Sequence, residues 1–202
     1  ERLRDWLARS TSNTFYGIAT GAAVTALVQS SSATTVAAVG FVGARLLTFT
    51  QALGIIFGAN IGTTITGWMV ALLGFKLKLT VAALPLLLVA STLHLFKSKE
   101  IVRSVGKALA GFCLIFIGIG YLQDGLAQYR EAIDLSEWQA SNIGGRFLLL
   151  MIGVLLTLIT QSSSATVAMA ITALNASLID LPQAAAIVIG ADIGTTGTAA
   201  LA

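Results

Sequence analysis

The stretch Gln29-Ser30-Ser31-Ser32-Ala33-Thr34, QSSSAT in one-letter code, lies inside an uncharged run from Ser10 to Ala44. The same six residues return at Gln161 to Thr166, inside another uncharged run from Phe147 to Ile179. Both runs are long enough to cross a bilayer, which takes about 17–25 mostly apolar residues. A polar hexapeptide in the middle of such a run predicts that the helix turns back there.

The composition is that of an integral membrane protein. Hydrophobic residues make up 56% of the chain, charged residues 10%, and the mean hydropathy is +0.88. A soluble domain carries roughly 25% charge. Further uncharged runs are Leu46 to Phe75, Leu79 to Phe96 and Ala108 to Gln123. We therefore expect a multi-pass protein of the cell membrane with the lipid bilayer as partner, and no nucleic-acid partner, because the basic residues lie in short loops.

The chain contains an internal repeat. A shift of 132 residues aligns Thr25–Thr66 with Thr157–Thr198 without a gap, and 20 of these 42 positions are identical. The identities gather in QSSSAT and in a second block, Gly-Ala-(Asn/Asp)-Ile-Gly-Thr-Thr, at Gly58 to Thr64 and Gly190 to Thr196. Two polar blocks in register indicate a duplication, which is a common plan of secondary transporters.

Counting membrane crossings predicts the orientation of the two copies. If QSSS turns the chain back, residues 14–44 form a re-entrant hairpin, and three crossings follow before Phe147. The second copy then enters from the opposite side, so the repeats are inverted. If residues 14–44 span straight through, there is one more crossing and the repeats are parallel.

The loop charges favour the inverted arrangement. On that interpretation one side holds eight basic residues and the other side four, which makes the first side cytoplasmic by the positive-inside rule. The eight are Arg2, Arg4, Arg9, Arg45, Lys97, Lys99, Arg103 and Lys107, and the four are Lys76, Lys78, Arg130 and Arg146. A straight crossing would move Arg45 away from the N-terminal arginines and blur this bias. We therefore predict a cytoplasmic N-terminus.

The resulting fold class is an all-α integral membrane protein with two inverted-topology repeats, each with a re-entrant helical hairpin and a broken transmembrane helix. Residues 1–123 would form the first repeat, with an amphipathic N-terminal helix, a hairpin and three transmembrane helices. Residues 124–145 would be an extracytoplasmic linker, and 146–202 the second repeat. The chain begins without Met and stops inside an apolar stretch, so we expect the second repeat to be truncated.

The polar blocks have a chemistry of their own. A hairpin tip exposes the N-terminus of its second helix, where free N–H groups and the helix dipole attract anions. The carbonyl oxygens at the end of the first helix suit a hard cation such as sodium, and the Gln29 and Gln161 amides can both donate and accept. In the second block, a carboxylate such as Asp192 costs about 2.5–3.5 kcal/mol at mid-membrane. That cost favours a functional role, either as a sodium ligand or as a partner of Asn60, while the glycines favour close helix packing.

Two QSSSAT motifs, each followed by the Gly-Ala-(Asn/Asp)-Ile-Gly-Thr-Thr block, resemble the type II sodium/phosphate cotransporter family. The resemblance implies sodium-coupled uptake of inorganic phosphate, with both QSSS regions forming the substrate and sodium sites. Carried onto this chain, the resemblance nominates for phosphate Gln29, Ser30, Ser31, Ser32, Gln161, Ser162, Ser163 and Ser164. For sodium we predict Thr34, Asn60, Thr63, Thr64, Thr166, Asp192, Thr195 and Thr196.

The leading hypothesis is thus a symporter that moves phosphate into the cell with sodium by alternating access. Na⁺ would be a co-transported ion, and we expect no resident cofactor. A sodium-independent anion channel, a carrier of another small oxyanion and a packing scaffold remain alternatives, and a homodimer is left open. An intramembrane serine enzyme is disfavoured because the chain has one histidine, His94, and no Gly-x-Ser-x-Gly elbow.

Overall fold

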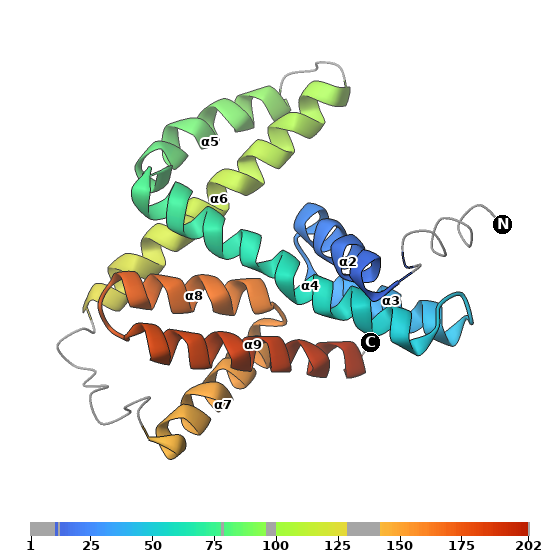
Figure 1. Ribbon diagram of the computed structural model, residues 1–202. Helices are drawn as coiled ribbons and strands as arrows, with labels where there is room; N and C mark the ends of the chain where they lie inside the picture. Colours follow the sequence, from blue (N-terminus) through green and yellow to red (C-terminus); the bar gives the residue numbers. More distant parts are fainter. Residues whose placement is uncertain (1–10, 12, 78, 96–99, 129–141, 202) are drawn as a thin grey trace.

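The computed structural model describes residues 11, 13–77, 79–95, 100–128 and 142–201, and these residues are almost entirely helical (Figure 1). In chain order the helices are α2 (Thr14–Val28), α3 (Ser31–Gly43), α4 (Phe49–Met69), η1 (Val70–Lys76), α5 (Leu79–Leu95), α6 (Glu100–Gln128), α7 (Ile143–Thr160), α8 (Ser163–Asn175) and α9 (Leu181–Leu201). The N-terminal amphipathic helix and most of the linker of the sequence-based interpretation lie outside the described residues.

The two copies of the repeat have the same local structure. Helices α2, α3 and α4 recur as α7, α8 and α9, and α2 packs mainly on α4 as α7 packs on α9. The four buried residues that hold the first copy together have counterparts 132 residues later in the core of the second. These pairs are Ala38 and Ala170, Leu47 and Ile179, Ala52 and Ala184, and Ile55 and Ile187. The duplication seen in the sequence is therefore a duplication of packing.

The QSSS stretch ends one helix and starts the next. Gln29 has a left-handed φ of 57°, which stops α2, and Ser30 is extended. The Ser30 Oγ accepts a hydrogen bond of 3.2 Å from the Ala33 N–H and so caps α3. Gln161, with φ 53°, and Ser162 do the same between α7 and α8. A left-handed residue followed by a serine cap is what makes the chain change direction here.

Glycines allow the paired helices to come into backbone contact. A Cβ placed on Gly58 would collide with the Ile18 carbonyl of α2, and one on Gly190 would collide with the Leu150 carbonyl of α7. The glycines of the second block therefore serve close packing, as expected for small residues at helix interfaces.

The prediction of a broken transmembrane helix is wrong in both copies, because α4 and α9 run unbroken through the second block. The polar residues of the block do not force a break, since their hydroxyls bond to carbonyls of their own helix. Thr63 Oγ1 donates to the Ala59 carbonyl at 3.1 Å, and Thr195 Oγ1 donates to the Ala191 carbonyl at 3.2 Å. The first of these helices changes its hydrogen-bond pattern only later, where η1 adds a π-helical segment.

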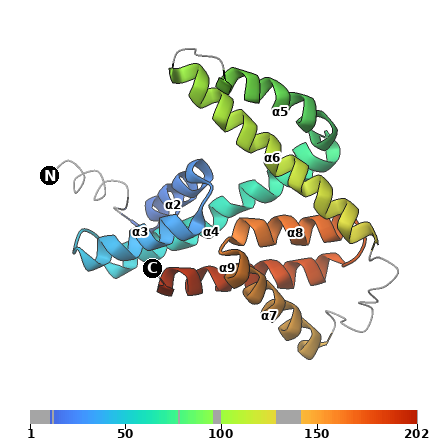
Figure 2. The same cartoon turned by 180° about the vertical axis from the view of Figure 1, so that it is seen from behind.

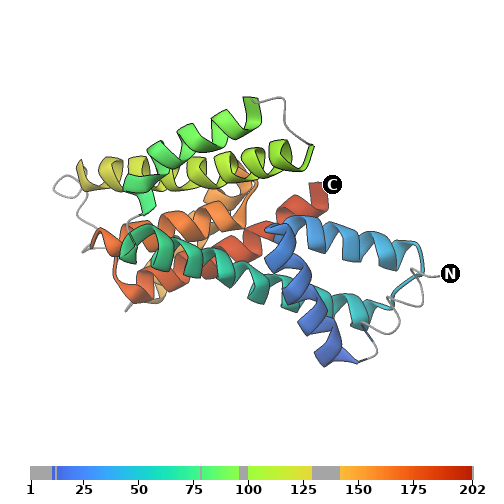
Figure 3. The ribbon, with the colours of Figure 1, turned by 90° about the horizontal axis from the view of Figure 1, so that it is seen from above.

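Helices α5 and α6 form an antiparallel pair beside the repeats (Figures 2 and 3). Their core includes Cys113 and Phe116, both almost fully buried, and it contacts η1. Among the described residues, three helices are long and apolar enough to cross a membrane: Phe49–Lys76, Glu100–Leu126 and Ile143–Thr160.

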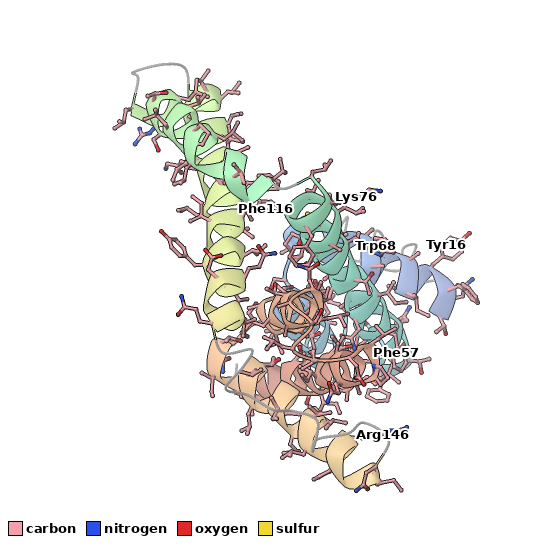
Figure 4. The ribbon with its side chains drawn as sticks, turned by 90° about the vertical axis from the view of Figure 1, so that its left-hand side faces the viewer. Tyr16, Phe57, Trp68, Lys76, Phe116 and Arg146 are labelled. Atoms are coloured by element: carbon pink, nitrogen blue, oxygen red, sulfur yellow. The ribbon has the colours of Figure 1, made fainter. Side chains whose placement is uncertain are left out.

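Large apolar side chains point away from the protein. Tyr16, Phe57 and Trp68 lie on the outer surface of α2 and α4 (Figure 4), and each is more than half exposed. Exposed apolar surface on this scale is expected of a protein surrounded by lipid rather than water.

A candidate binding site at two helix tips

The two QSSS turns meet near the middle of the molecule, although 132 residues separate them (Figure 3). Ser31 Oγ and Ser163 Oγ share a hydrogen bond of 2.9 Å, and both serines are buried. Around this contact lies a small cleft of about 30 Å³. Its lining consists of the eight residues nominated for phosphate: Gln29, Ser30, Ser31, Ser32, Gln161, Ser162, Ser163 and Ser164.

The cleft lies at the N-termini of two helices, α3 and α8. The first N–H groups of a helix have no carbonyl partner within the helix, and the helix dipole places about half a positive charge there. The Ser30 and Ser162 caps take up the Ala33 and Ala165 N–H groups. Two converging N-termini make a site suited to a small anion without any arginine or lysine in its lining.

The two glutamines that flank the cleft are turned toward their own helices. Gln29 Nε2 donates to the Ala26 carbonyl at 2.6 Å, and Gln161 Nε2 donates to the Leu158 carbonyl at 2.6 Å. Gln29 Oε1 also accepts a hydrogen bond of 2.9 Å from Thr66 Oγ1 on α4. The glutamine amides thus cap the ends of α2 and α7 and retain one Nε2 hydrogen each for a ligand.

The residues predicted for sodium do not line the cleft, and they divide by exposure. Thr34, Thr63, Thr166 and Thr195 are buried, Asn60 and Asp192 are half-buried, and Thr64 and Thr196 are exposed. Thr64 Oγ1 and Thr196 Oγ1 donate to carbonyls one turn back, Ile61 and Ile193. Among the described residues, no hydrogen bond joins Asp192 to Asn60. Of the residues predicted for sodium, Thr34 and Thr166 bond to lining residues, because their hydroxyls donate to the Ser30 and Ser162 carbonyls.

Sequence reasoning missed two residues that belong to these tips. Thr25 Oγ1 donates to Thr34 Oγ1 at 2.9 Å, and Thr157 Oγ1 donates to Thr166 Oγ1 at 2.9 Å. Both donors lie in the last turn of their helices, where Thr25 is followed by apolar residues and Thr157 is followed by one further polar residue, Thr160. The signal was present in the repeat, because Thr25 and Thr157 are identical at the first aligned position.

The fold and the cleft together define a helical membrane protein with two repeats whose QSSS turns meet at one small polar cleft. The family model "Na+/Pi-cotransporter" matches residues 1–124 and 128–202, so the chain belongs to this family. YqeW of Bacillus subtilis, a protein without an assigned function, is 30% identical over 88% of this chain and 56% of its own length. YjbB of Salmonella typhimurium, named as a candidate inorganic phosphate export protein, is 32% identical over 96% of this chain and 35% of its own.

A vertebrate relative matches a shorter region at higher identity. Human sodium-dependent phosphate transport protein 2B is 52% identical over 62 residues, which is 31% of this chain and 9% of that protein. The chain spans about half, or less, of the length of the curated relatives it matches. No solved structure matches the chain.

Proposed function

We propose that the chain carries the substrate site of a phosphate transporter that couples inorganic phosphate to sodium and takes both into the cell. The observation that supports the proposal most directly is the cleft between the α3 and α8 N-termini, with its serine lining. Phosphate is an oxyanion that accepts hydrogen bonds on every side. Hydroxyl and backbone N–H donors at two dipole ends provide the matching donors.

The described conformation is closed around that site. A cleft of about 30 Å³ has room for about two water molecules, and the bond between Ser31 and Ser163 crosses it. Admitting a tetrahedral oxyanion requires the two tips to separate. In an alternating-access cycle, separation toward one side of the membrane and then the other would carry the ion across.

Sodium would bind beside the phosphate and reduce the cost of bringing its charge to mid-membrane. Thr34 and Thr166 adjoin the tips, and Asp192 supplies a carboxylate with no hydrogen-bond or ion-pair partner among the described residues. A carboxylate in such a position favours a cation close to it. The two copies of the second block contain the remaining residues nominated for sodium: Asn60, Thr63, Thr64, Thr195 and Thr196.

Re-entrant hairpins and inverted repeats are part of the proposal. The contacts between the two copies are reciprocal, since α3 contacts α9 while α4 contacts α8. Such reciprocity is the mark of a pseudo-two-fold axis. With that axis in the membrane plane, the turns at Arg45 and Ser177 lie on opposite sides of the membrane. Cysteines placed at these two turns should then react with a membrane-impermeant maleimide from opposite sides, whereas labelling from one side would exclude inversion.

The central test is phosphate flux in proteoliposomes that contain the full-length protein. An imposed sodium gradient should drive phosphate accumulation, and collapsing the gradient should abolish it. Phosphate flux that is linear in substrate and indifferent to sodium would favour a channel, and equal flux of other small oxyanions would exclude phosphate selectivity. Reversing the gradient tests direction, which matters because YjbB is named for export. Phosphate uptake that occurs only when the sodium gradient points outward would overturn inward symport.

A further inference from the structure

The two threonines missed by the sequence form matching hydroxyl chains. In the first copy Thr25 Oγ1 donates to Thr34 Oγ1 at 2.9 Å, and Thr34 Oγ1 donates to the Ser30 carbonyl at 3.1 Å. In the second copy Thr157 Oγ1 donates to Thr166 Oγ1 at 2.9 Å, and Thr166 Oγ1 donates to the Ser162 carbonyl at 3.4 Å. Each chain links the last turn of the first helix to the capping residue of the second.

Both donors are enclosed by protein. Thr25 is 1% exposed and Thr157 is 0% exposed. The Cβ of Thr25 lies against Gly62 of α4, and that of Thr157 lies against Gly194 of α9. A larger residue at either glycine would displace the threonine. The threonine hydroxyl is therefore held in one position by packing and not only by its hydrogen bond.

The bonding pattern of these threonines differs from that of most other threonines on the described helices. Thr63, Thr64 and Thr172 each donate to a carbonyl of their own helix three or four residues back. Thr25 and Thr157 instead donate across the turn, to a residue nine positions later. A hydrogen bond across the turn ties the direction of the second helix to that of the first.

We propose that Thr25 and Thr157 are positioning residues, which hold the α3 and α8 N-termini in the orientation that binds the anion. The inference rests on the proposed phosphate site, because it is the orientation of that site that the chains would fix. The second helix contacts the first only sparsely and packs mainly on α4 in the first copy and on α9 in the second. The threonine bond is therefore a direct link between the two helices of each hairpin, next to the N-terminus that it would orient. Loss of the hydroxyl would allow the helix to tilt and so weaken the cap that Ser30 or Ser162 makes.

The test is a threonine series in the full-length protein. Thr25→Val and Thr157→Val keep the side-chain shape and remove the donor, whereas Thr25→Ser and Thr157→Ser keep the donor. A net hydrogen bond corresponds to roughly a three- to tenfold effect in an equilibrium constant. We therefore expect the valine variants to raise the phosphate KM about three- to tenfold, with a smaller change in maximal rate, and the serine variants to restore the KM.

Thr35→Val is the matched control. Thr35 is buried on the same helix α3, but its Oγ1 has no hydrogen-bond partner within the described part of the chain, and the second copy carries Val167 at this position. The phosphate KM of this variant should equal that of the wild type. A rise in KM with Thr35→Val as large as that with Thr25→Val would overturn the proposal, because the effect would then belong to any buried threonine of the hairpin.

A second measurement is independent of transport. Amide hydrogen exchange at Ala33 and Ala165, whose N–H groups bond to the capping serines, should accelerate in the matching valine variant and not in Thr35→Val. Unchanged exchange and an unchanged KM in both valine variants would overturn the positioning role. Failure of serine to restore either quantity would do the same. If the wild-type protein moves no phosphate, the proposed function fails, and accelerated exchange would still show that the hydroxyl chain orders the tip.

Discussion

The two copies of the repeat have one backbone plan but differ in a few informative side chains. The QSSSAT hexapeptide and the threonine before it are the same in both copies, so both turns have the left-handed glutamine, the serine cap and the threonine pair. The differences include Val28 against Thr160 directly before the turn, Asn60 against Asp192, Thr35 against Val167, and Arg45 against Ser177. The longest shared polar sequence is thus at the tips, while the copies differ in charge at positions such as 45 and 192 and their counterparts.

This division shows which changes should act alike in both copies and which should not. Substitutions in the shared packing should give paired effects of similar size. Substitutions at the unlike positions should act in one copy alone. A clear departure from either pattern would mean that the two copies are less alike in their response to mutation than their similar structures indicate.

The largest paired effect is expected at the glycines of the second block. Gly58→Ala and Gly190→Ala would each push a methyl group into a carbonyl of the facing helix, Ile18 or Leu150. Overpacking of this kind costs about 1–3 kcal/mol and sometimes more, and a backbone neighbour cannot yield as a side chain would. Both variants should lose thermal stability in detergent by similar amounts.

Gly40→Ala is the control for these glycines. A Cβ at Gly40 of α3 would meet nothing within 4 Å, and alanine is better than glycine in a helix by about 1 kcal/mol. This variant should be as stable as the wild type or slightly more stable. Equal losses at Gly40 and Gly58 would contradict the view that close backbone contact explains the block.

A one-sided effect is expected at Asp192. If its carboxylate helps to hold sodium, Asp192→Asn should raise the sodium concentration for half-maximal phosphate transport about tenfold, which corresponds to about 1.4 kcal/mol. The measurement is the sodium dependence of phosphate uptake into proteoliposomes. Asn60→Asp in the same background moves the carboxylate to the equivalent position of the first copy. Partial recovery there would indicate two interchangeable half-sites.

An unchanged sodium dependence in Asp192→Asn would remove this carboxylate from the proposed cation site. The half-buried carboxylate would then need another explanation, and Thr34 and Thr166 would be the next residues to test.

Much of this division could be predicted from the sequence. The helix interruption at QSSS followed from placing a polar hexapeptide in an apolar run, and the observed ends of α2, α3, α7 and α8 coincide with it. The 132-residue offset predicted which positions correspond, and every corresponding helix end after the QSSS turns obeys it. Local polarity and internal repetition can both be recognised from the sequence without knowledge of the tertiary structure.

The rest depended on partners that spacing does not reveal. A threonine in an apolar helix can bond to its own carbonyls, as Thr63 does, or across a turn, as Thr25 does. The sequence reads the same in both cases, so the unbroken α4 and the hydroxyl chains were both missed. The sequence likewise does not predict which way the Gln29 and Gln161 amides point, because their hydrogen-bond partners depend on the geometry of the turn.

The smallest effect, and the most selective, is expected at Thr35 and Val167. Both side chains are about equally buried, at 6% exposure, but the Thr35 hydroxyl finds no hydrogen-bond partner among the residues that the structure describes. Leaving a buried hydroxyl unbonded costs about 1–3 kcal/mol, and valine has nearly the same shape. Thr35→Val should therefore stabilise the protein by about 1 kcal/mol in thermal unfolding in detergent. Val167→Thr should destabilise it by a similar amount, unless its hydroxyl finds the Ser163 carbonyl one turn back. A loss of stability with Thr35→Val would mean that its hydroxyl has a partner in the membrane, such as a bound ion or water, and that the first copy holds a ligand that the second cannot.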